Sequence, residues 1–220
     1  MQKLSRRFAL GTLMAISLSG LTSCSQSQIY AIDKSSGVYV TIPKGWHKIS
    51  NKQLNSAEAK STAEGAAERL ASVVWQEAYS TSPETLPLSI FSLESPKKGA
   101  VVYVRVRDLS YDDLNSVSYN SLRNIILPIT TWLEDPEKAN PKFALFDDYE
   151  RVEKIARGVR TIYTFDDPNE VSQTVDQTAM VSDDRSRIYL VIVRASTKYF
   201  KKHGPELQKI GDSFTVRGNK

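Results

Sequence analysis

The sequence is poor in the residues that carry most enzymatic chemistry near neutral pH. It holds one cysteine, Cys24, and two histidines, His47 and His203, among 220 residues. A single cysteine allows no internal disulfide and no set of thiol ligands for zinc. Histidine is the usual proton carrier and metal ligand at this pH, and neither histidine has a second ligand at a zinc-like spacing. We therefore predict no metal and no cofactor.

Catalytic motifs are also missing from the sequence. It contains no Gly-x-Ser-x-Gly elbow, no phosphate loop and no Gly-x-Gly-x-x-Gly fingerprint. A serine triad assembled from distant residues stays open, because triads are recognised in space. Four Asp-Asp pairs supply paired carboxylates, at 112–113, 147–148, 166–167 and 183–184. Helix starts and turns favour aspartate for backbone hydrogen bonds, so we predict structural roles for them and no enzyme activity.

A long apolar run is the third absence. The apolar run near the N-terminus, Phe8 to Leu21, carries no charge and follows Lys3, Arg6 and Arg7. It is shorter than the roughly 20 apolar residues that a transmembrane helix needs. A basic start, a short apolar middle and small residues at the end are typical of a secretory signal.

The apolar stretch ends on the only cysteine. Leu21-Thr22-Ser23-Cys24 resembles the lipobox of bacterial lipoproteins. The resemblance implies cleavage before Cys24, a diacylglycerol on its sulfur and attachment to the extracytoplasmic face of the cell membrane. The Sec route is the default export route, and the pair Arg6-Arg7 leaves the twin-arginine route open.

Export also changes the charge of the protein. The chain has 29 basic and 25 acidic residues, a net charge of +4. Residues 1–23 hold three of the basic residues and none of the acidic ones, so the remainder carries a net charge of +1. Nucleic-acid binding needs a clustered basic surface. We therefore predict no nucleic-acid partner.

We predict three parts for the chain. Residues 1–23 form the signal peptide, residues 24–36 a flexible polar tether, and residues 37–217 a single globular domain. About 180 residues are enough to bury an ordinary hydrophobic core.

Strand patterns dominate the predicted domain. Alternating or β-branched segments bounded by turn residues predict strands at 37–42, 88–93, 100–106, 149–155, 160–165, 173–181, 187–194 and 214–216. Apolar residues at spacings of three and four predict helices from about 61 to 74 and from 110 to 128. A third helix is expected from 198 to 210, with Gly204-Pro205 interrupting or restarting it. Val73-Val74-Trp75 can equally begin a strand.

The strand order predicts an antiparallel meander in the second half. The segment 187–194 is apolar on both faces, so we expect it to be central and covered on both sides. The predicted fold class is α+β, with an antiparallel sheet covered by helices on both faces, an α/β/α sandwich.

This pattern resembles the Mog1/PsbP-like family, including its actinobacterial lipoproteins. The resemblance rests on the first strand with Pro43-Lys44-Gly45-Trp46, on the meander, and on the last helix leading to Ile210-Gly211-Asp212-Ser213-Phe214. The family provides a platform for binding partners and has no shared catalytic motif. The resemblance therefore implies a binding role.

Tryptophan marks the candidate binding residues, because it is enriched at binding hot spots. We expect Trp46 to cover one end of the sheet. Trp132 lies in a proline-flanked connection, so we expect it to be exposed. We therefore predict that Trp132 contacts a partner or an apolar ligand.

The leading hypothesis is a lipid-anchored, non-catalytic binding or accessory module for an envelope protein or assembly. The alternative is a lipid or small-molecule carrier with a pocket between the sheet and the helices. An envelope hydrolase ranks third and requires His47 or His203 beside a serine and a carboxylate.

Overall fold

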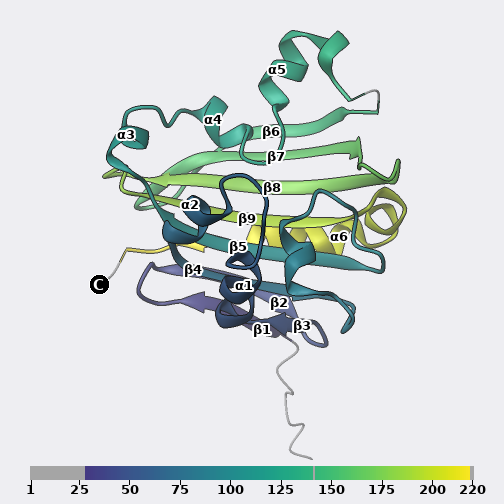
Figure 1. The fold of residues 1–220 in the computed structure, drawn as a ribbon, viewed down its shortest axis with the longest axis horizontal. Helices are drawn as coiled ribbons and strands as arrows, with labels where there is room; N and C mark the ends of the chain where they lie inside the picture. Colours follow the sequence, from purple (N-terminus) through teal and green to yellow (C-terminus); the bar gives the residue numbers. More distant parts are fainter. Residues whose placement is uncertain (1–27, 141, 219–220) are drawn as a thin grey trace, which may run out of the picture.

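The computed structural model describes residues 28–140 and 142–218, which form a mixed α+β fold with antiparallel sheets (Figure 1). The predicted signal peptide and Cys24 lie outside the described residues. The antiparallel α+β arrangement expected from the sequence is confirmed.

A seven-stranded antiparallel sheet forms the centre of the molecule. Its strand order is β3-β4-β5-β9-β8-β7-β6, so β9 occupies the middle position. The meander of four strands predicted in the second half is confirmed as β6 to β9. The strands are β3 (His47–Ile49), β4 (Val73–Ser80), β5 (Ala100–Asp108), β6 (Ala144–Val152), β7 (Ala156–Asp166), β8 (Ser172–Ser182) and β9 (Arg187–Ser196).

The central strands bury side chains on both faces, because successive residues point in opposite directions. Tyr189, Val191 and Val193 of β9 join one apolar core. Leu190 and Ile192 of the same strand join a second core on the other side of the sheet. The large sheet therefore separates two hydrophobic cores.

One face carries a long helix and a second, smaller sheet. Helix α6 (Thr197–Ser213) begins at Ser196, whose hydroxyl accepts a hydrogen bond from the backbone N–H of Tyr199. It packs against β8, β9 and β2 and lies behind the large sheet in Figure 1. The small sheet has the order β1-β2-β10, with β1 (Gln28–Asp33), β2 (Val38–Pro43) and β10 (Thr215–Val216).

The other face carries short helices and irregular chain. Helix α1 packs against β4, and α4 packs against β7 and β8. Only α1 reaches eight residues. These elements are α1 (Asn51–Glu58), α2 (Ala66–Ala71), η1 (Pro87–Phe91), α3 (Tyr111–Leu114), α4 (Tyr119–Arg123), α5 (Ile129–Glu134) and η2 (Pro136–Lys138).

The predicted helices of the first half are wrong in extent. The helix expected from 61 to 74 shrinks to α2, because Gly65 adopts a positive φ of 71° and Val73 already begins β4. The helix expected from 110 to 128 is broken into α3 and α4. Ser118 and Ser121 form a capping box there, since serine competes for backbone hydrogen bonds and favours helix ends.

The strand predicted at 88–93 is also wrong. Residues Pro87–Phe91 form the 3-10 helix η1, with proline in its first turn and the Ser89 hydroxyl donating to the Leu86 carbonyl. Strand β5 pairs with β4 on one side and with β9 on the other. The sequence allowed either a helix or a strand at Val73-Val74-Trp75, and the structure shows that these residues begin strand β4.

The predicted tether reaches into the fold, and this part of the prediction is wrong. Gln28–Asp33 forms β1 and pairs residue by residue with β2, from Gln28 opposite Pro43 to Asp33 opposite Val38. Ala31 is fully buried in the core beside α6. Ile29 and Ala31 alternate with residues that point outward, which is a strand pattern. The neighbouring residues are polar and rich in serine and glutamine, so the sequence predicts a tether instead.

Candidate functional site

The tight turn between β8 and β9 lies between two hollows in the surface. The Ser182 hydroxyl donates to the Asp184 carboxylate at 2.6 Å, and the backbone N–H and hydroxyl of Ser186 donate to the same carboxylate. These hydrogen bonds, the Ser182 hydroxyl first, lower the pKa of Asp184 to about 2. Arg185 adopts a positive φ of 59°, which projects its side chain away from the turn.

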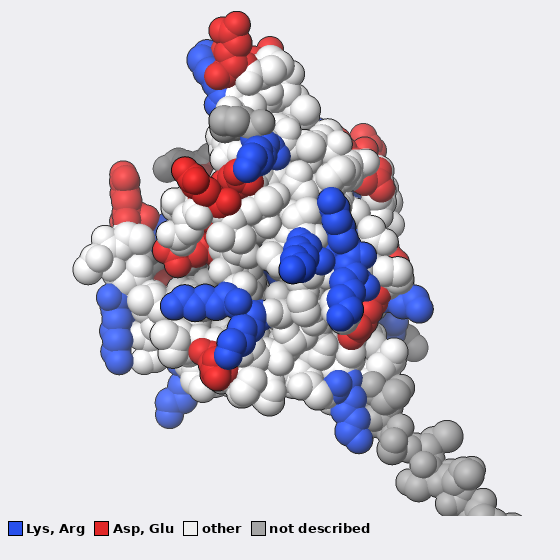
Figure 2. All heavy atoms as spheres, turned by 90° about the vertical axis from the view of Figure 1, so that its right-hand side faces the viewer, with Lys and Arg blue, Asp and Glu red and all other residues white. Residues whose placement is uncertain are grey.

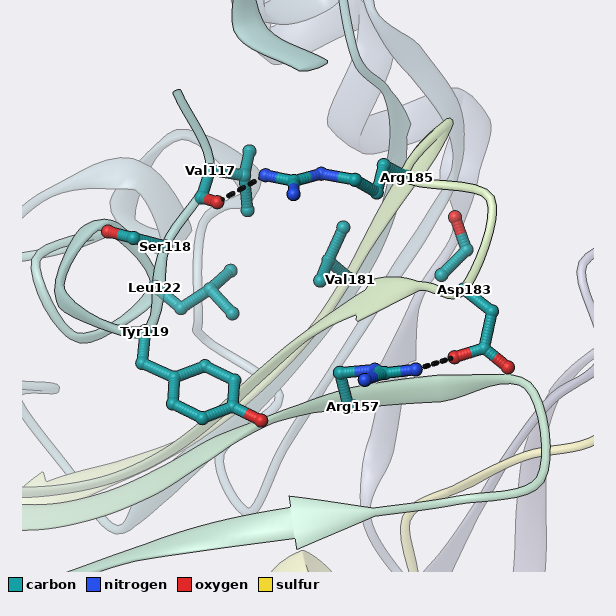
Figure 3. A pocket seen from close by; sticks show the side chains of 9 residues that line it. Val117, Ser118, Tyr119, Leu122, Arg157, Val181, Asp183 and Arg185 are labelled. Atoms are coloured by element: carbon teal, nitrogen blue, oxygen red, sulfur yellow. Dashed lines mark hydrogen bonds and ion pairs between the residues drawn. The ribbon is translucent and has the colours of Figure 1, made fainter. Parts of the chain in front are cut away.

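One hollow lies between this turn and the start of α4 (Figure 3). Its volume is about 390 Å³. We call it the arginine hollow, and it is lined by Val117, Ser118, Tyr119, Leu122, Arg157, Val181, Ser182, Asp183 and Arg185.

The floor of the arginine hollow is apolar. Leu122 of α4 is fully buried and Val181 of β8 is 8% exposed, and both belong to the core on the face away from α6. Val117 and Tyr119 are half-buried and continue this apolar surface outward. A small apolar side chain from another molecule would lose its contact with water here.

Two arginines stand at the rim of the hollow. The Arg185 guanidinium donates to the Val117 carbonyl at 2.6 Å, and Arg157 forms an ion pair of 3.0 Å with Asp183 (Figure 3). The Arg157 and Asp183 side chains are 59% and 52% exposed. Exposed guanidinium groups of this kind are suited to a carboxylate, which they bind through two parallel hydrogen bonds.

A second hollow, of about 500 Å³, lies on the other side of the same turn. It shares Ser182 and Asp183 with the first and adds Arg187, whose Nε donates to Asp108 at 3.0 Å. The turn therefore stands between two open depressions, each with an arginine beside an aspartate.

Basic residues are mixed with acidic ones on another side of the molecule. Figure 2 shows the end that lies to the right in Figure 1, where lysine, arginine, aspartate and glutamate are interspersed.

Trp132, the predicted binding residue, is not freely exposed. It is half-buried on α5, and its ring packs edge-to-face on Phe143 with 5.1 Å between ring centroids. The pair lies against the core on the face away from α6. The expectation of an exposed Trp132 is therefore wrong, because its ring packs on Phe143 and on the neighbouring core residues. Cys24, the predicted lipidation residue, lies outside the described residues.

The two histidines lie apart from serine nucleophiles. His203 stacks on Tyr199 and stands 3.9 Å from the Glu206 carboxylate, while His47 is exposed in β3. Within residues 28–140 and 142–218, neither histidine hydrogen-bonds to a serine, and no three histidine, cysteine or acidic side chains are grouped to hold a metal.

The carrier alternative needs a pocket between the sheet and the helices. The space between the sheet and α6 is filled by buried side chains, among them Phe200, Leu207 and Ile210 of the helix. On the other face the arginine hollow lies between α4 and strands β7 and β8, and it is open to solvent. In the described part of the chain, no helix is long and apolar enough to cross a membrane.

The residues of the arginine hollow were not predicted from the sequence. Leu122 falls within the helix predicted from 110 to 128 and Val181 at the end of the strand predicted at 173–181, and no site role was expected for either or for Arg185. The one signal was the turn of Asp183, Asp184 and Arg185, in which two acidic residues precede a basic one, a composition that any exposed turn allows.

No protein-family model matches the chain, and no curated protein matches it in sequence. Solved structures show similarity. They include the PsbP protein CyanoP of Synechocystis sp. PCC 6803, with 12% identity, 94% of this chain and 99% of that chain covered, and a TM-score of 0.44. LpqN, involved in cell envelope biogenesis of Mycobacterium tuberculosis, has 12% identity, coverages of 87% and 91%, and a TM-score of 0.44.

The Ran-binding protein Mog1p of Saccharomyces cerevisiae is also similar, with 7% identity, coverages of 86% and 95%, and a TM-score of 0.41. PsbP and Mog1 give their names to the family that the sequence resembles. At identities and TM-scores this low, membership of that family stays a prediction, and we draw no functional conclusion from these similarities.

Proposed function

We propose that the protein is a membrane-anchored, non-catalytic binding module of the cell envelope. In this proposal Cys24 carries the lipid anchor, and the arginine hollow binds an exposed segment of an envelope protein. The bound segment presents an acidic residue beside an apolar one.

The observation that carries the binding role is the pairing of a buried apolar floor with exposed guanidinium groups. Val117 and Tyr119, which are half-buried above the buried Leu122 and Val181, offer a surface for one apolar side chain. Arg185 already spans the hollow by donating to a backbone carbonyl, so its remaining N–H groups are held in place for an incoming carboxylate. An acidic-apolar segment satisfies both surfaces at once.

Site-specific photo-crosslinking in the protein's own cells tests this proposal. A photoreactive residue at Tyr119 should give one main adduct, and the crosslinked peptide of the partner should contain acidic residues. The same group at Lys202, which is exposed on α6, serves as the control.

The Arg185→Asn variant then tests the charge. Asparagine tolerates a positive φ, so the turn keeps its conformation while the guanidinium is lost. Since a hydrogen bond to a charged group contributes roughly 1.5–3 kcal/mol, we expect the adduct yield from position 119 to fall at least about tenfold. An adduct that forms equally from position 202, or one unaffected by Arg185→Asn, contradicts a partner site in the hollow.

A further inference from the structure

The outer face of the small sheet is an exposed surface close to the predicted anchor. On β1, Ala31 points into the core, whereas Tyr30 and Ile32 point outward and are 46% and 37% exposed. They pair with Thr41 and Tyr39 of β2, which are half-buried on the same outer face. Two tyrosines and an isoleucine therefore form an amphipathic patch.

Basic residues frame this patch. The Arg217 guanidinium lies over the Tyr39 ring, 5.0 Å from its centroid. Lys34, in the turn after β1, and Lys44, in the turn after β2, are exposed at opposite ends of the strand pair. Aromatic side chains with polar tips and neighbouring lysines are the combination found where proteins meet lipid headgroups.

The distance from the anchor to the fold is short. Only three residues separate Cys24 from Gln28, the first residue of β1. Because an extended chain spans at most about 3.6 Å per residue, the Cα atoms of Cys24 and Gln28 are at most about 14 Å apart. A lipid on Cys24 thus keeps the start of β1 within about 14 Å of the lipidated residue, and so close to the bilayer surface.

We propose that the outer face of the small sheet, formed by Tyr30, Ile32 and Tyr39 with Lys34 and Lys44, lies on the anionic headgroup surface of the membrane. This inference rests on the anchor at Cys24 in the proposed function. The inference gives the domain a fixed orientation on the membrane, whereas the lipid anchor alone would let it rotate freely.

The orientation has a consequence for the partner site. The inner face of the small sheet packs into the core beside α6, whereas the floor of the arginine hollow belongs to the core on the opposite face of the large sheet. A membrane under Tyr30 and Ile32 therefore leaves the hollow turned toward the envelope space, where a partner can reach it.

Depth-dependent fluorescence quenching tests the orientation in the processed full-length protein. An Ile32→Cys variant is labelled with a small fluorophore, since the sulfur of Cys24 is blocked by lipid in this proposal. The protein is placed in vesicles of phosphatidylethanolamine and phosphatidylglycerol that contain headgroup-labelled nitroxide lipid. Val152→Cys is the matched control, because Val152 is 74% exposed on β6, the strand at the far edge of the large sheet.

We expect nitroxide lipid to cause a loss of fluorescence at position 32 and none at position 152. Lys34→Glu combined with Lys44→Glu should reduce the quenching at position 32. Lys52→Glu combined with Lys60→Glu, at exposed positions on and just after α1, should leave it unchanged.

Three outcomes overturn the inference. Equal quenching at positions 32 and 152 in protein that floats with the vesicles shows a freely tumbling domain, and the anchor then stands without the orientation. Energy transfer between labels at position 32, at low protein density, shows that a second copy covers the face. Protein that neither floats nor carries the lipid mass overturns the anchor and the inference together.

Discussion

The two faces of the large sheet are covered in different ways. One face is covered by α6, a 17-residue helix, and by the small sheet. The other is covered by helices of four to eight residues and by irregular chain. A long helix satisfies most of its own backbone hydrogen bonds, whereas short helices and loops leave many carbonyl groups that need other donors.

The buried polar side chains follow this difference. Under α6 they form a charge pair: Arg160, 3% exposed, donates to both oxygens of Asp176 at 2.8 and 2.7 Å. On the other face one buried charge pair joins Arg105 of β5 to Glu58 of α1 at 3.1 Å, and the remaining buried polar side chains serve the loops. Arg194 donates to the carbonyls of Ser89, Ile90 and Ser92 around η1, and burial lowers its pKa to about 10.

Glutamines of β8 serve the same purpose as Arg194. Gln173 donates to the Leu93 carbonyl, and Gln177 donates to those of Leu122 and Arg123. On the irregular face, side chains of the sheet donate hydrogen bonds to loop and helix-end carbonyls that have no backbone donor, and these bonds stabilise the loops and short helices. This arrangement fixes α4, and with it one wall of the arginine hollow.

Removing the charge pair under α6 should have the largest effect. Asp176→Ala leaves the buried Arg160 guanidinium with Asp212, whose side chain is 61% exposed, as its remaining carboxylate partner. We expect the free energy of unfolding to fall by about 3–5 kcal/mol, measured by urea denaturation. Asp183→Ala is the control, because exposed pairs such as that of Asp183 with Arg157 contribute at most about 1 kcal/mol. Equal effects of the two variants would contradict the account of this face.

Removing Arg194 should have a smaller and more local effect. In Arg194→Met the carbonyls around η1 lose their charged donor, so we expect a loss of about 2–3 kcal/mol. Hydrogen exchange should rise between residues 86 and 99 and stay unchanged in α6. Arg187→Met, which breaks an exposed contact with Asp108, is the matched control. Faster exchange in α6 as well would show that the two faces are not independent.

Acid should produce the smallest effect, at the β8–β9 turn. The pKa of Asp184 is lowered to about 2 in the folded protein from a usual value of 3.8, so its contribution is present above pH 4 and is lost as the pH falls from 4 to 2. Nuclear magnetic resonance of the Ser182 and Ser186 amides should report this loss. Asp184→Ala should remove the acid-dependent part of the change; a transition that persists in the variant belongs to another group.

Prediction from the sequence succeeded where the chain is regular. Strands β6 to β9 are long, rich in β-branched and apolar residues and bounded by turn residues, so the local sequence predicts their pairing as a meander. Helix α6 was also predicted, and it continues through Pro205. The first half failed where tertiary contacts decide the outcome. Val73 continues a helical pattern in the sequence, yet pairing with β5 makes it a strand.

The candidate site could not be predicted for a related reason. The arginine hollow is lined by residues from α4, β7 and the β8–β9 turn. These segments are far apart in the sequence, so no local pattern predicts that Leu122 and Arg185 line the same hollow. The tether prediction failed because a six-residue strand flanked by serine and glutamine resembles polar linker. Only its pairing with β2 shows that it belongs to the fold.

The mass of the protein purified from its own membranes tests the central claim most directly. The account predicts a chain that begins at Cys24, lacks residues 1–23 and carries the added mass of a diacylglyceryl group on the sulfur. A chain that retains residues 1–23 and has an unmodified thiol would contradict it.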